Sequence, residues 1–271
     1  MLYYLAPVIL LILIYLFTIM PRMINRRDFT PFWDRYYAHR GLHKESAIAP
    51  ENSIKAFELA IERGYGIELD VQLSKDNIPV VFHDLNLKRL CGIDKKVKDL
   101  TFEELRNLRL YDSNEQIPHF KEVLELVDGK VPLIVELKLE NNDTKVCEVA
   151  ASLLDNYKGV YCIESFDPFA LLWYKKNRPQ IIRGQLSTNY IKRNSRGNKA
   201  IYFLLQNLNF NFLTKPDFIA FNYIYRNMLS YKLCRRLYGI VTVAYTIKSK
   251  KNLEESKNSF DLFIFEGFVP E

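Results

Sequence analysis

Residues 66–84 read GIELDVQLSKDNIPVVFHD, and this stretch decides the fold. A first β-rich run is followed, after the four polar residues Ser74–Asn77, by a second β-rich run, Ile78–His83. A parallel crossover needs a dozen or more residues, so the second run must return as the antiparallel arm of a hairpin. With the turn in the middle of the polar stretch, His83 faces Glu68 to within one register step.

Short β-rich runs alternate with helical patterns along the rest of the chain, and no Gly/Ser- or Pro-rich linker separates them. Alternating β and α over roughly 240 residues predicts an α/β fold, a closed barrel of eight parallel strands, for which about 250 residues is typical. The hairpin is then an insertion after the second strand. The eight predicted strands are Tyr36–Arg40, Gly66–Val71, Val131–Lys138, Val160–Phe166, Ile181–Ser187, Asp217–Phe221, Ile240–Thr246 and Asp261–Glu266.

Helix signals lie between these runs. Ser53–Arg63 carries apolar residues at helical spacing, and Thr101–Glu104 is a capping box. Asp167-Pro168 combines an N-cap acid with proline in the first turn. Weaker patterns over Met228–Leu237 and Asn252–Lys257 complete the predicted outer ring of helices.

Composition excludes several classes of protein. With 48% hydrophobic and 26% charged residues, the chain is neither disordered nor wholly embedded in a membrane. A net charge of +6 is too small to indicate nucleic-acid binding. The four cysteines contain no Cys-x-x-Cys pair, which favours scattered buried thiols over a zinc site.

The N-terminus reads as a membrane segment. Leu2–Met20 has no charged side chain and approaches the roughly 20 residues of a bilayer-spanning helix. A cleaved signal peptide would need a positive start and a small-residue cleavage site, which are missing. A buried core helix would rarely be so uniformly apolar. We therefore expect an uncleaved transmembrane helix.

This expectation divides the chain into three parts, namely an anchor over residues 1–21, a basic linker over residues 22–31 and the barrel over residues 32–271. The arginines of the linker follow the apolar segment directly. The positive-inside rule then predicts a single-pass cell-membrane protein with its barrel in the cytoplasm.

Acidic side chains gather at the ends of the predicted strands, where α/β barrels hold their active sites. Glu68 and Asp70 are two residues apart, so a strand directs both to one face, and Glu136 and Lys138 follow the same rule. Three buried carboxylates need a partner. Glu68, Asp70 and Glu136 form an all-oxygen set that suits Mg²⁺ or Ca²⁺.

Two cations and two histidines accompany these carboxylates. Arg40 can bind a phosphate through paired N–H groups, and Lys138 can act as a point charge. His39 and His83 suit general acid/base chemistry near neutral pH. A metal, two cations and two histidines together indicate a site that cleaves phosphodiesters.

Each feature also has a structural interpretation. A single histidine at a strand end is commonly a hydrogen-bonded structural residue, and Glu-x-Asp is commonly a solvated edge. Glu136 and Lys138 alone would be consistent with a structural ion pair. Their joint occurrence, in barrel order, favours an active site.

The order and spacing of these motifs resemble the glycerophosphodiester phosphodiesterase family. The resemblance covers residues 36 to 187 well and rests on short motifs throughout that region. They are His39-Arg-Gly41, Ala49-Pro-Glu-Asn-Ser53, Ala56-Phe57, Ile67-Glu-Leu-Asp-Val71, Ser74-Lys-Asp76, Pro79-Val-Val-Phe-His-Asp84, Val135-Glu-Leu-Lys138, Glu164-Ser-Phe-Asp-Pro168 and Arg183-Gly-Gln-Leu-Ser187.

The resemblance implies hydrolysis of a glycerophosphodiester to sn-glycerol 3-phosphate and an alcohol. It also implies a two-step route in which a glycerol hydroxyl attacks phosphorus and water then opens the cyclic phosphate. The roles that it implies are metal ligation by Glu68, Asp70 and Glu136, acid/base catalysis by His39 and His83, phosphate binding by Arg40 and Lys138, and a supporting role for Glu51.

The C-terminal part departs from the family pattern. Tyr245-Thr246 stands where the family usually has Trp-Thr, and Tyr245 can still line a wall for the substrate. The last strand ends in Phe265-Glu266 rather than Thr-Asp. This departure puts local packing and substrate fit in question more than metal chemistry.

Three functions stay open at this point. The first is a membrane-anchored, metal-dependent glycerophosphodiesterase. The second is a lysophospholipase D that acts on lysolipids in the membrane, motivated by the anchor and by the apolar run Ile201–Leu213. The third is a non-catalytic protein that binds glycerophosphates or a partner, motivated by the altered C-terminal end.

Overall fold

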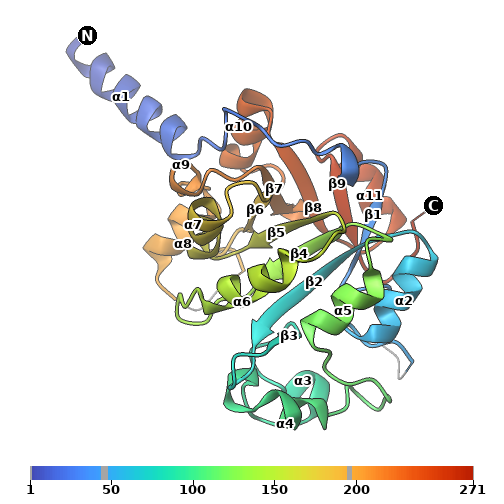
Figure 1. The fold of residues 1–271 in the computed structure, drawn as a ribbon. Helices are drawn as coiled ribbons and strands as arrows, with labels where there is room; N and C mark the ends of the chain where they lie inside the picture. Colours follow the sequence, from blue (N-terminus) through green and yellow to red (C-terminus); the bar gives the residue numbers. More distant parts are fainter. Residues whose placement is uncertain (1, 44–47, 194–196, 271) are drawn as a thin grey trace.

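The computed structural model describes residues 2–43, 48–193 and 197–270. Within these residues, eight parallel strands close into a barrel because β1 (Tyr36–His39) pairs with strands on both sides. Figure 1 shows the strands running toward one common end of the molecule. The predicted barrel is confirmed, and its other parallel strands are β2 (Gly66–Leu73), β4 (Leu133–Leu137), β5 (Tyr161–Ser165), β6 (Arg183–Ser187), β7 (Phe218–Asn222), β8 (Val241–Ile247) and β9 (Leu262–Phe265).

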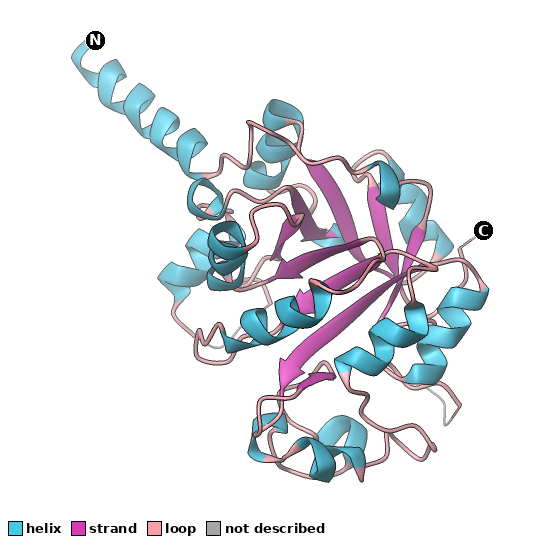
Figure 2. Cartoon of the chain, viewed as in Figure 1, coloured by secondary structure: helices cyan, strands magenta, loops and turns pink. Residues whose placement is uncertain are grey.

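Helices surround the barrel on its outer face (Figure 2), and the main apolar core lies between them and the strands. The predicted helix starts hold: Ser53, Thr101 and Asp167 each cap a helix through the side chain. The helices after the N-terminal one are α2 (Ile54–Glu62), α3 (Lys88–Cys91), α4 (Phe102–Arg106), α5 (Phe120–Val127), α6 (Lys145–Leu154), α7 (Pro168–Asn177), α8 (Lys199–Gln206), α9 (Asn211–Thr214), α10 (Leu229–Tyr238) and α11 (Lys250–Lys257), with 3₁₀ turns at Thr30–Phe32, Val97–Asp99 and Tyr223–Tyr225.

The hairpin insertion is present, with β3 (Pro79–Val81) antiparallel to β2. Its register pairs Val71 with Val81, one residue away from the pairing that would set His83 opposite Glu68. The cause is the loop Lys75–Asn77, which is closed by the Ser74 N–H donating to Ile78 O at 3.0 Å. Asn77 adopts φ 60° there, the left-handed conformation that closes such hairpins. Because β3 ends at Val81, His83 lies in the loop beyond the ladder.

The N-terminal helix, α1, runs from Leu2 to Thr18 over 17 residues, shorter than the predicted transmembrane segment. The chain leaves the helix there because Ile19 is fully buried against the barrel and accepts a hydrogen bond from Asn211 Nδ2 at 3.0 Å. Across the described part of the chain, we find no helix with both the length and the apolarity needed to cross a membrane. The predicted transmembrane helix is therefore not supported.

Residues 22–33 cover the amino end of the barrel. Phe29 and Phe32 are buried there, and the Phe29 ring lies 5.9 Å from that of Phe218. The hydroxyl of Tyr37, inside the barrel, donates to Phe32 O at 2.8 Å. The amino end is thus closed by aromatic packing, while the carboxyl end carries the polar cluster. The division of the chain at residues 21 and 31 stays a prediction.

Candidate active site

Strand register gathers acidic side chains into one layer at the carboxyl end of the barrel. Asp70 on β2 is aligned with Glu136 on β4, and Glu136 is aligned with Glu164 on β5. Glu68 lies two residues before Asp70 on the same face and is aligned with His39 on β1. Inward-facing positions of such barrels usually hold Val, Ile or Leu, so four buried carboxyl groups here need an explanation.

Glu68, Asp70 and Glu136 offer oxygens that all lie within 4.8 Å of one another. Burial, followed by the charges of Asp70 and Glu136, raises the pKa of Glu68 well above its usual value. Burial also raises the pKa of Glu136. Crowded anions that raise one another's pKa are what a bound cation would relieve, and all-oxygen ligands suit Mg²⁺ or Ca²⁺. The residues therefore fit a divalent cation, as the sequence predicts, although neither ion is favoured over the other.

Arg40 and Lys138 supply the positive charge beside this group. Lys138 Nζ lies 2.8 Å from Glu136 Oε1 and 3.0 Å from Asp70 Oδ1. Arg40 Nη1 lies 2.6 Å from Glu51 Oε1. Burial would raise the pKa of Asp70, but Lys138, His83 and Arg40 outweigh it and hold that pKa well below the usual range.

The turn after β1 explains the glycine of the His-Arg-Gly motif. Arg40 has φ 56° and Gly41 has φ 83°, so the backbone is left-handed at two successive residues. A Cβ on Gly41 would lie 2.8 Å from the backbone carbon of Ala56. Only glycine allows this approach, and the resulting turn lets the Arg40 N–H donate to Glu68 Oε2 at 3.1 Å.

Each of the two histidines is held at Nδ1 by a carboxylate. His83 Nδ1 lies 2.6 Å from Asp84 Oδ1, and His39 Nδ1 lies 2.7 Å from Glu266 Oε2. A protonated Nδ1 that donates to the carboxylate leaves Nε2 free to accept a proton. Burial and then Arg40 lower the pKa of His39 to about 4, against the opposing effect of Glu266.

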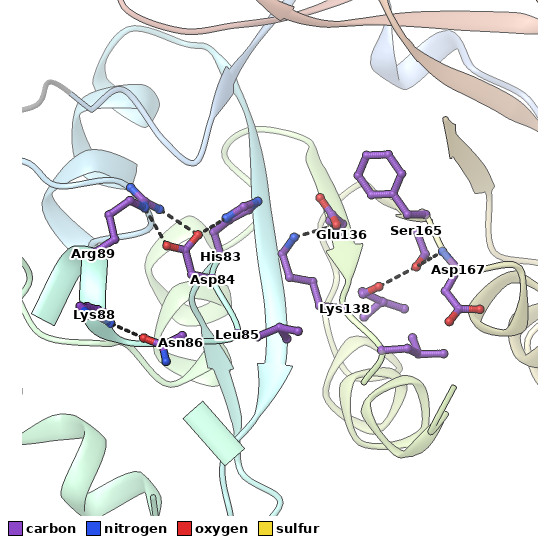
Figure 3. Close-up of a pocket in the computed structure, with 13 residues that line it drawn as sticks. His83, Asp84, Leu85, Asn86, Lys88, Arg89, Glu136, Lys138, Ser165 and Asp167 are labelled. Carbon is purple, nitrogen blue, oxygen red and sulfur yellow. Dashed lines mark hydrogen bonds and ion pairs between the residues drawn. The ribbon is translucent and has the colours of Figure 1, made fainter. Parts of the chain in front are cut away.

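Arg89 links the two sides of the site and was not predicted. Its guanidinium binds Asp84, with Nε 2.6 Å from Oδ2, and Glu51, with Nη1 2.7 Å from Oε2. A chain of ion pairs therefore runs from Arg40 through Glu51 and Arg89 to Asp84 and the histidine beside it. Figure 3 shows the last part of this chain, from Arg89 to Asp84 and His83. The only sequence signal for it was a basic residue five positions after Asp84, in α3 beyond the hairpin.

The sequence analysis assigned no role to two more groups. Asn52 adopts φ 57° and donates from Nδ2 to Asp70 Oδ2 at 2.8 Å, so the Pro-Glu-Asn motif orients a predicted metal ligand. His43 joins His39 and Glu266 in a second group whose ligand atoms lie within 4.8 Å of one another. Glu266 stands where the family usually has a different residue, so the motif spacing did not predict its contact with His39.

Most of the residues of the polar cluster line a cavity of about 490 Å³. Tyr245 forms part of its wall, donates its hydroxyl to Ser187 O at 2.8 Å, and lies 6.0 Å from the ring of Phe166. Of the predicted site residues, those lining this cavity are His39, Arg40, Glu51, Glu68, His83, Glu136 and Tyr245. Asp70 is fully buried and does not line the cavity, and Lys138 lines the neighbouring cleft. The structure thus brings the set together, while the role of each residue stays a prediction.

A second, more open cleft of about 660 Å³ adjoins the cavity. Figure 3 shows it between the hairpin insertion, with His83 to Arg89, and the loops after β4 and β5. His83, Arg89, Glu136 and Phe166 line both spaces. The polar cluster therefore sits where two connected spaces meet.

A closed parallel barrel with its polar cluster at the carboxyl ends of the strands defines a TIM-barrel protein with the active-site location of that class. Residues 39–251 match the model of the glycerophosphoryl diester phosphodiesterase family, and the chain belongs to this family.

Curated relatives agree with this assignment. The chain is 35% identical over 161 residues to a glycerophosphodiester phosphodiesterase of Caldanaerobacter subterraneus subsp. tengcongensis, a match that covers 55% of this chain and 65% of the relative. It is 31% identical over 151 residues to a lysophospholipase D of Rattus norvegicus, covering 51% of this chain and 46% of that relative. Across the first three curated relatives, the chain spans 65%, 51% and 46% of their length.

Solved structures extend the likeness to most of the chain. A phosphodiesterase of Oleispira antarctica, in complex with the product sn-glycerol-3-phosphate, superposes with a TM-score of 0.69 at 25% identity. That match covers 87% of this chain and 93% of the other. A glycerophosphodiester phosphodiesterase of Thermotoga maritima gives a TM-score of 0.66 at 26% identity, covering 85% of this chain and 94% of the other.

Proposed function

We propose that this chain hydrolyses glycerophosphodiesters to sn-glycerol 3-phosphate and an alcohol in a reaction that depends on a divalent cation. The observation that carries the proposal is the meeting of three carboxylates, two cations and two carboxylate-held histidines at the carboxyl end of the barrel, around the cavity and the cleft beside it. Membership in the family and the product complex of the Oleispira relative support the same substrate class.

Phosphate binding falls to the cationic side chains. Arg40 and Lys138 lie on either side of Asp70, with Arg40 Nε 3.3 Å from Oδ2 and Lys138 Nζ 3.0 Å from Oδ1. Both side chains have N–H groups that can also donate hydrogen bonds to phosphoryl oxygens. Glu68, Asp70 and Glu136 would hold the Mg²⁺ or Ca²⁺ ion, which when bound supplies further charge neutralisation at the phosphate.

Proton transfer falls to His39 and His83. In the first step, one Nε2 takes the proton of the glycerol hydroxyl next to the phosphate as its oxygen bonds to phosphorus. The other histidine donates a proton to the alcohol oxygen as the bond from phosphorus to that oxygen breaks. In the second step, water opens the cyclic phosphate with the two roles reversed, which gives sn-glycerol 3-phosphate.

The test is an assay of the full chain on glycerophosphocholine, glycerophosphoethanolamine and glycerophosphoglycerol, with Mg²⁺, with Ca²⁺ and with chelator. We expect metal-dependent release of sn-glycerol 3-phosphate, and loss of that release in His39→Ala. Turnover of this kind would exclude the non-catalytic alternative. A folded chain that binds the ion and turns over none of the three diesters would refute the proposal.

A second candidate function is a lysophospholipase D, favoured by apolar side chains of α8 that face solvent. Ile201, Phe203 and Leu204 are 50%, 55% and 40% exposed, a surface suited to a lipid chain. Some relatives of similar identity carry the name lysophospholipase D. Release of choline from lysophosphatidylcholine, but not from glycerophosphocholine, would favour this function.

We also propose that the chain is held at the cell membrane through α1, with the barrel in the cytoplasm. The support is a run of large apolar side chains on α1 that face solvent, from Leu5 and Val8–Ile14 to Phe17. Such a surface is expected to enter lipid. Sedimentation with phosphatidylglycerol/phosphatidylethanolamine vesicles should carry the chain down, and Leu10→Asp with Leu13→Asp should leave it in solution. Equal recovery of both proteins in the supernatant would contradict the attachment.

A further inference from the structure

The two connected spaces of the site differ in enclosure and in chemistry. The cavity of about 490 Å³ opens at the mouth of the barrel, while the cleft of about 660 Å³ runs outward past Leu85 and Leu139. A phosphodiester has two arms, and the histidine lining both spaces, His83, lies at their junction. A phosphodiester with its phosphate at this junction would have a separate space for each arm.

Glu164 lines the cavity of about 490 Å³ and has no role so far. It is 1% exposed, and its Oε2 has no hydrogen-bond partner among the described residues. It is also outside the group of three carboxylates whose oxygens lie within 4.8 Å of one another. A buried carboxyl oxygen without a partner is costly, so its retention in a substrate cavity indicates a ligand group that satisfies it.

Neighbouring polar groups already have partners. Ser165 Oγ donates to Leu137 O at 2.7 Å, and Tyr245 donates to Ser187 O at 2.8 Å. Gln185 Nε2 donates to Ser165 O at 3.1 Å. Glu164, by contrast, lines the cavity and keeps an oxygen that can bind a ligand.

We propose that Glu164 is a specificity-determining residue that hydrogen-bonds the terminal hydroxyl of the glycerol arm, the hydroxyl that does not attack phosphorus. This inference rests on the proposed function. The attacking hydroxyl is on the carbon next to the phosphoester and must lie beside a histidine and the ligands Glu68, Asp70 and Glu136. The terminal hydroxyl lies one carbon further, and Glu164 lies one strand further, about 4.8 Å beyond β4.

The same contact separates the two candidate substrates. In a 1-acyl lysolipid the terminal oxygen is esterified, so it has no proton to donate and carries a bulky chain. Glu164 then favours the free glycerol arm over the acylated arm. The more open cleft is left for the alcohol, which varies among glycerophosphodiesters.

The test compares glycerophosphocholine with its analogue in which hydrogen replaces the terminal hydroxyl, leaving the attacking hydroxyl in place. Wild type should prefer the natural diester by about 10- to 100-fold in kcat/KM, the range for losing one hydrogen bond to a charged or strongly polar group. Glu164→Leu should reduce this preference to within about 3-fold, mainly by losing activity on the natural diester. Glu164→Gln, which keeps hydrogen-bonding atoms, should retain most of it. Glu148→Leu, on the exposed face of α6, is the matched control and should behave as wild type.

A binding readout separates this inference from the proposed function. Titration calorimetry with sn-glycerol 3-phosphate and with its deoxy analogue, in the presence of Ca²⁺, should show the same preference in wild type and its loss in Glu164→Leu. Glu164→Ala, which adds no bulk, replaces the leucine variant if thermal unfolding shows that the latter is not folded. A wild-type preference that survives both substitutions overturns the role of Glu164. Absence of turnover with any diester, while the binding preference is present, overturns the proposed function alone.

Discussion

Both ends of the barrel bury charged side chains. At the amino end opposite charges are paired, whereas at the carboxyl end like charges are crowded together. At the amino end, Arg183 is 1% exposed, with Nε donating to Thr214 O at 3.0 Å and Nη2 to Lys215 O at 2.9 Å. Asp217 accepts from the backbone N–H of Arg183 at 3.1 Å and pairs with Arg22 at 3.0 Å. At the carboxyl end, burial and the charges of neighbouring carboxylates instead raise the pKa of Glu68 and of Glu164.

This difference indicates that the amino end of the barrel contributes stability and that the carboxyl end carries the chemistry. Arg183 stays paired and bonded to the backbone, although burial lowers its pKa to about 10. The carboxyl end gathers four buried carboxyl groups around the two cations Arg40 and Lys138, an arrangement that costs stability without a further cation. A fold retains such a cluster when binding or catalysis needs it.

The largest effect should follow from Glu68→Gln. The amide removes one anionic ligand, so we expect metal affinity to fall and activity to drop by at least roughly 10³-fold. Because burial and repulsion raise the pKa of Glu68, the free energy of unfolding without metal should stay equal or rise. Thermal unfolding with and without Ca²⁺ measures both effects, since bound metal stabilises only a chain that binds it. A lower free energy of unfolding for the metal-free variant would show that Glu68 also stabilises the fold.

Next in size is His83→Ala, for which we expect a rate loss of roughly 10²–10⁴-fold with metal binding unchanged. The reason is that His83 is held by Asp84 in the loop after β3, outside the groups whose atoms lie close enough to share a metal. Single-turnover kinetics measures the rate loss, and calcium titration measures whether metal affinity is unchanged. Loss of calcium binding would identify His83 as a ligand rather than an acid/base group.

These two effects concern residues that the sequence predicted, and the reason is the regularity of the barrel. Alternation along a strand puts Glu68 and Asp70 on one face, and parallel strands bring their carboxyl ends to one rim, so the carboxylate group follows from pattern alone. The eight strands are confirmed to within one or two residues at their ends for the same reason.

Contacts between loops did not follow from pattern. The position of His83 depends on a three-residue turn whose left-handed Asn77 shifts the register by one residue. The pairing of His39 with Glu266 joins residues 227 positions apart, and only the closure of the barrel brings them together. The N-terminal helix was predicted from hydropathy, which says nothing about the packing of Ile19 on the barrel that ends it.

A smaller effect is expected at Arg89, which tests whether the ion-pair chain positions the histidine. Arg89→Met removes the contacts with Asp84 and Glu51 while keeping the length of the side chain. We expect kcat to fall by about 10- to 100-fold with little change in metal affinity, because His83 and Asp84 lose their fixed orientation. The control is Arg106→Met, on α4 of the same insertion, where the arginine pairs with Glu122 at the surface. Equal activity of the two variants would make the chain of ion pairs structural only.

The smallest effect on activity should come from the amino end, where Phe29 packs against Phe218 and is 7% exposed. Phe29→Ala leaves a cavity and should lower the free energy of unfolding by about 3 kcal/mol. Its kcat/KM at a temperature where the chain stays folded should remain within about 2-fold of wild type, because no group at the carboxyl end changes its partners. Urea unfolding and the diester assay measure the two quantities on one preparation. If kcat/KM fell in step with stability, the two ends would be coupled through the barrel, and the assignment of stability to one end and chemistry to the other would be wrong.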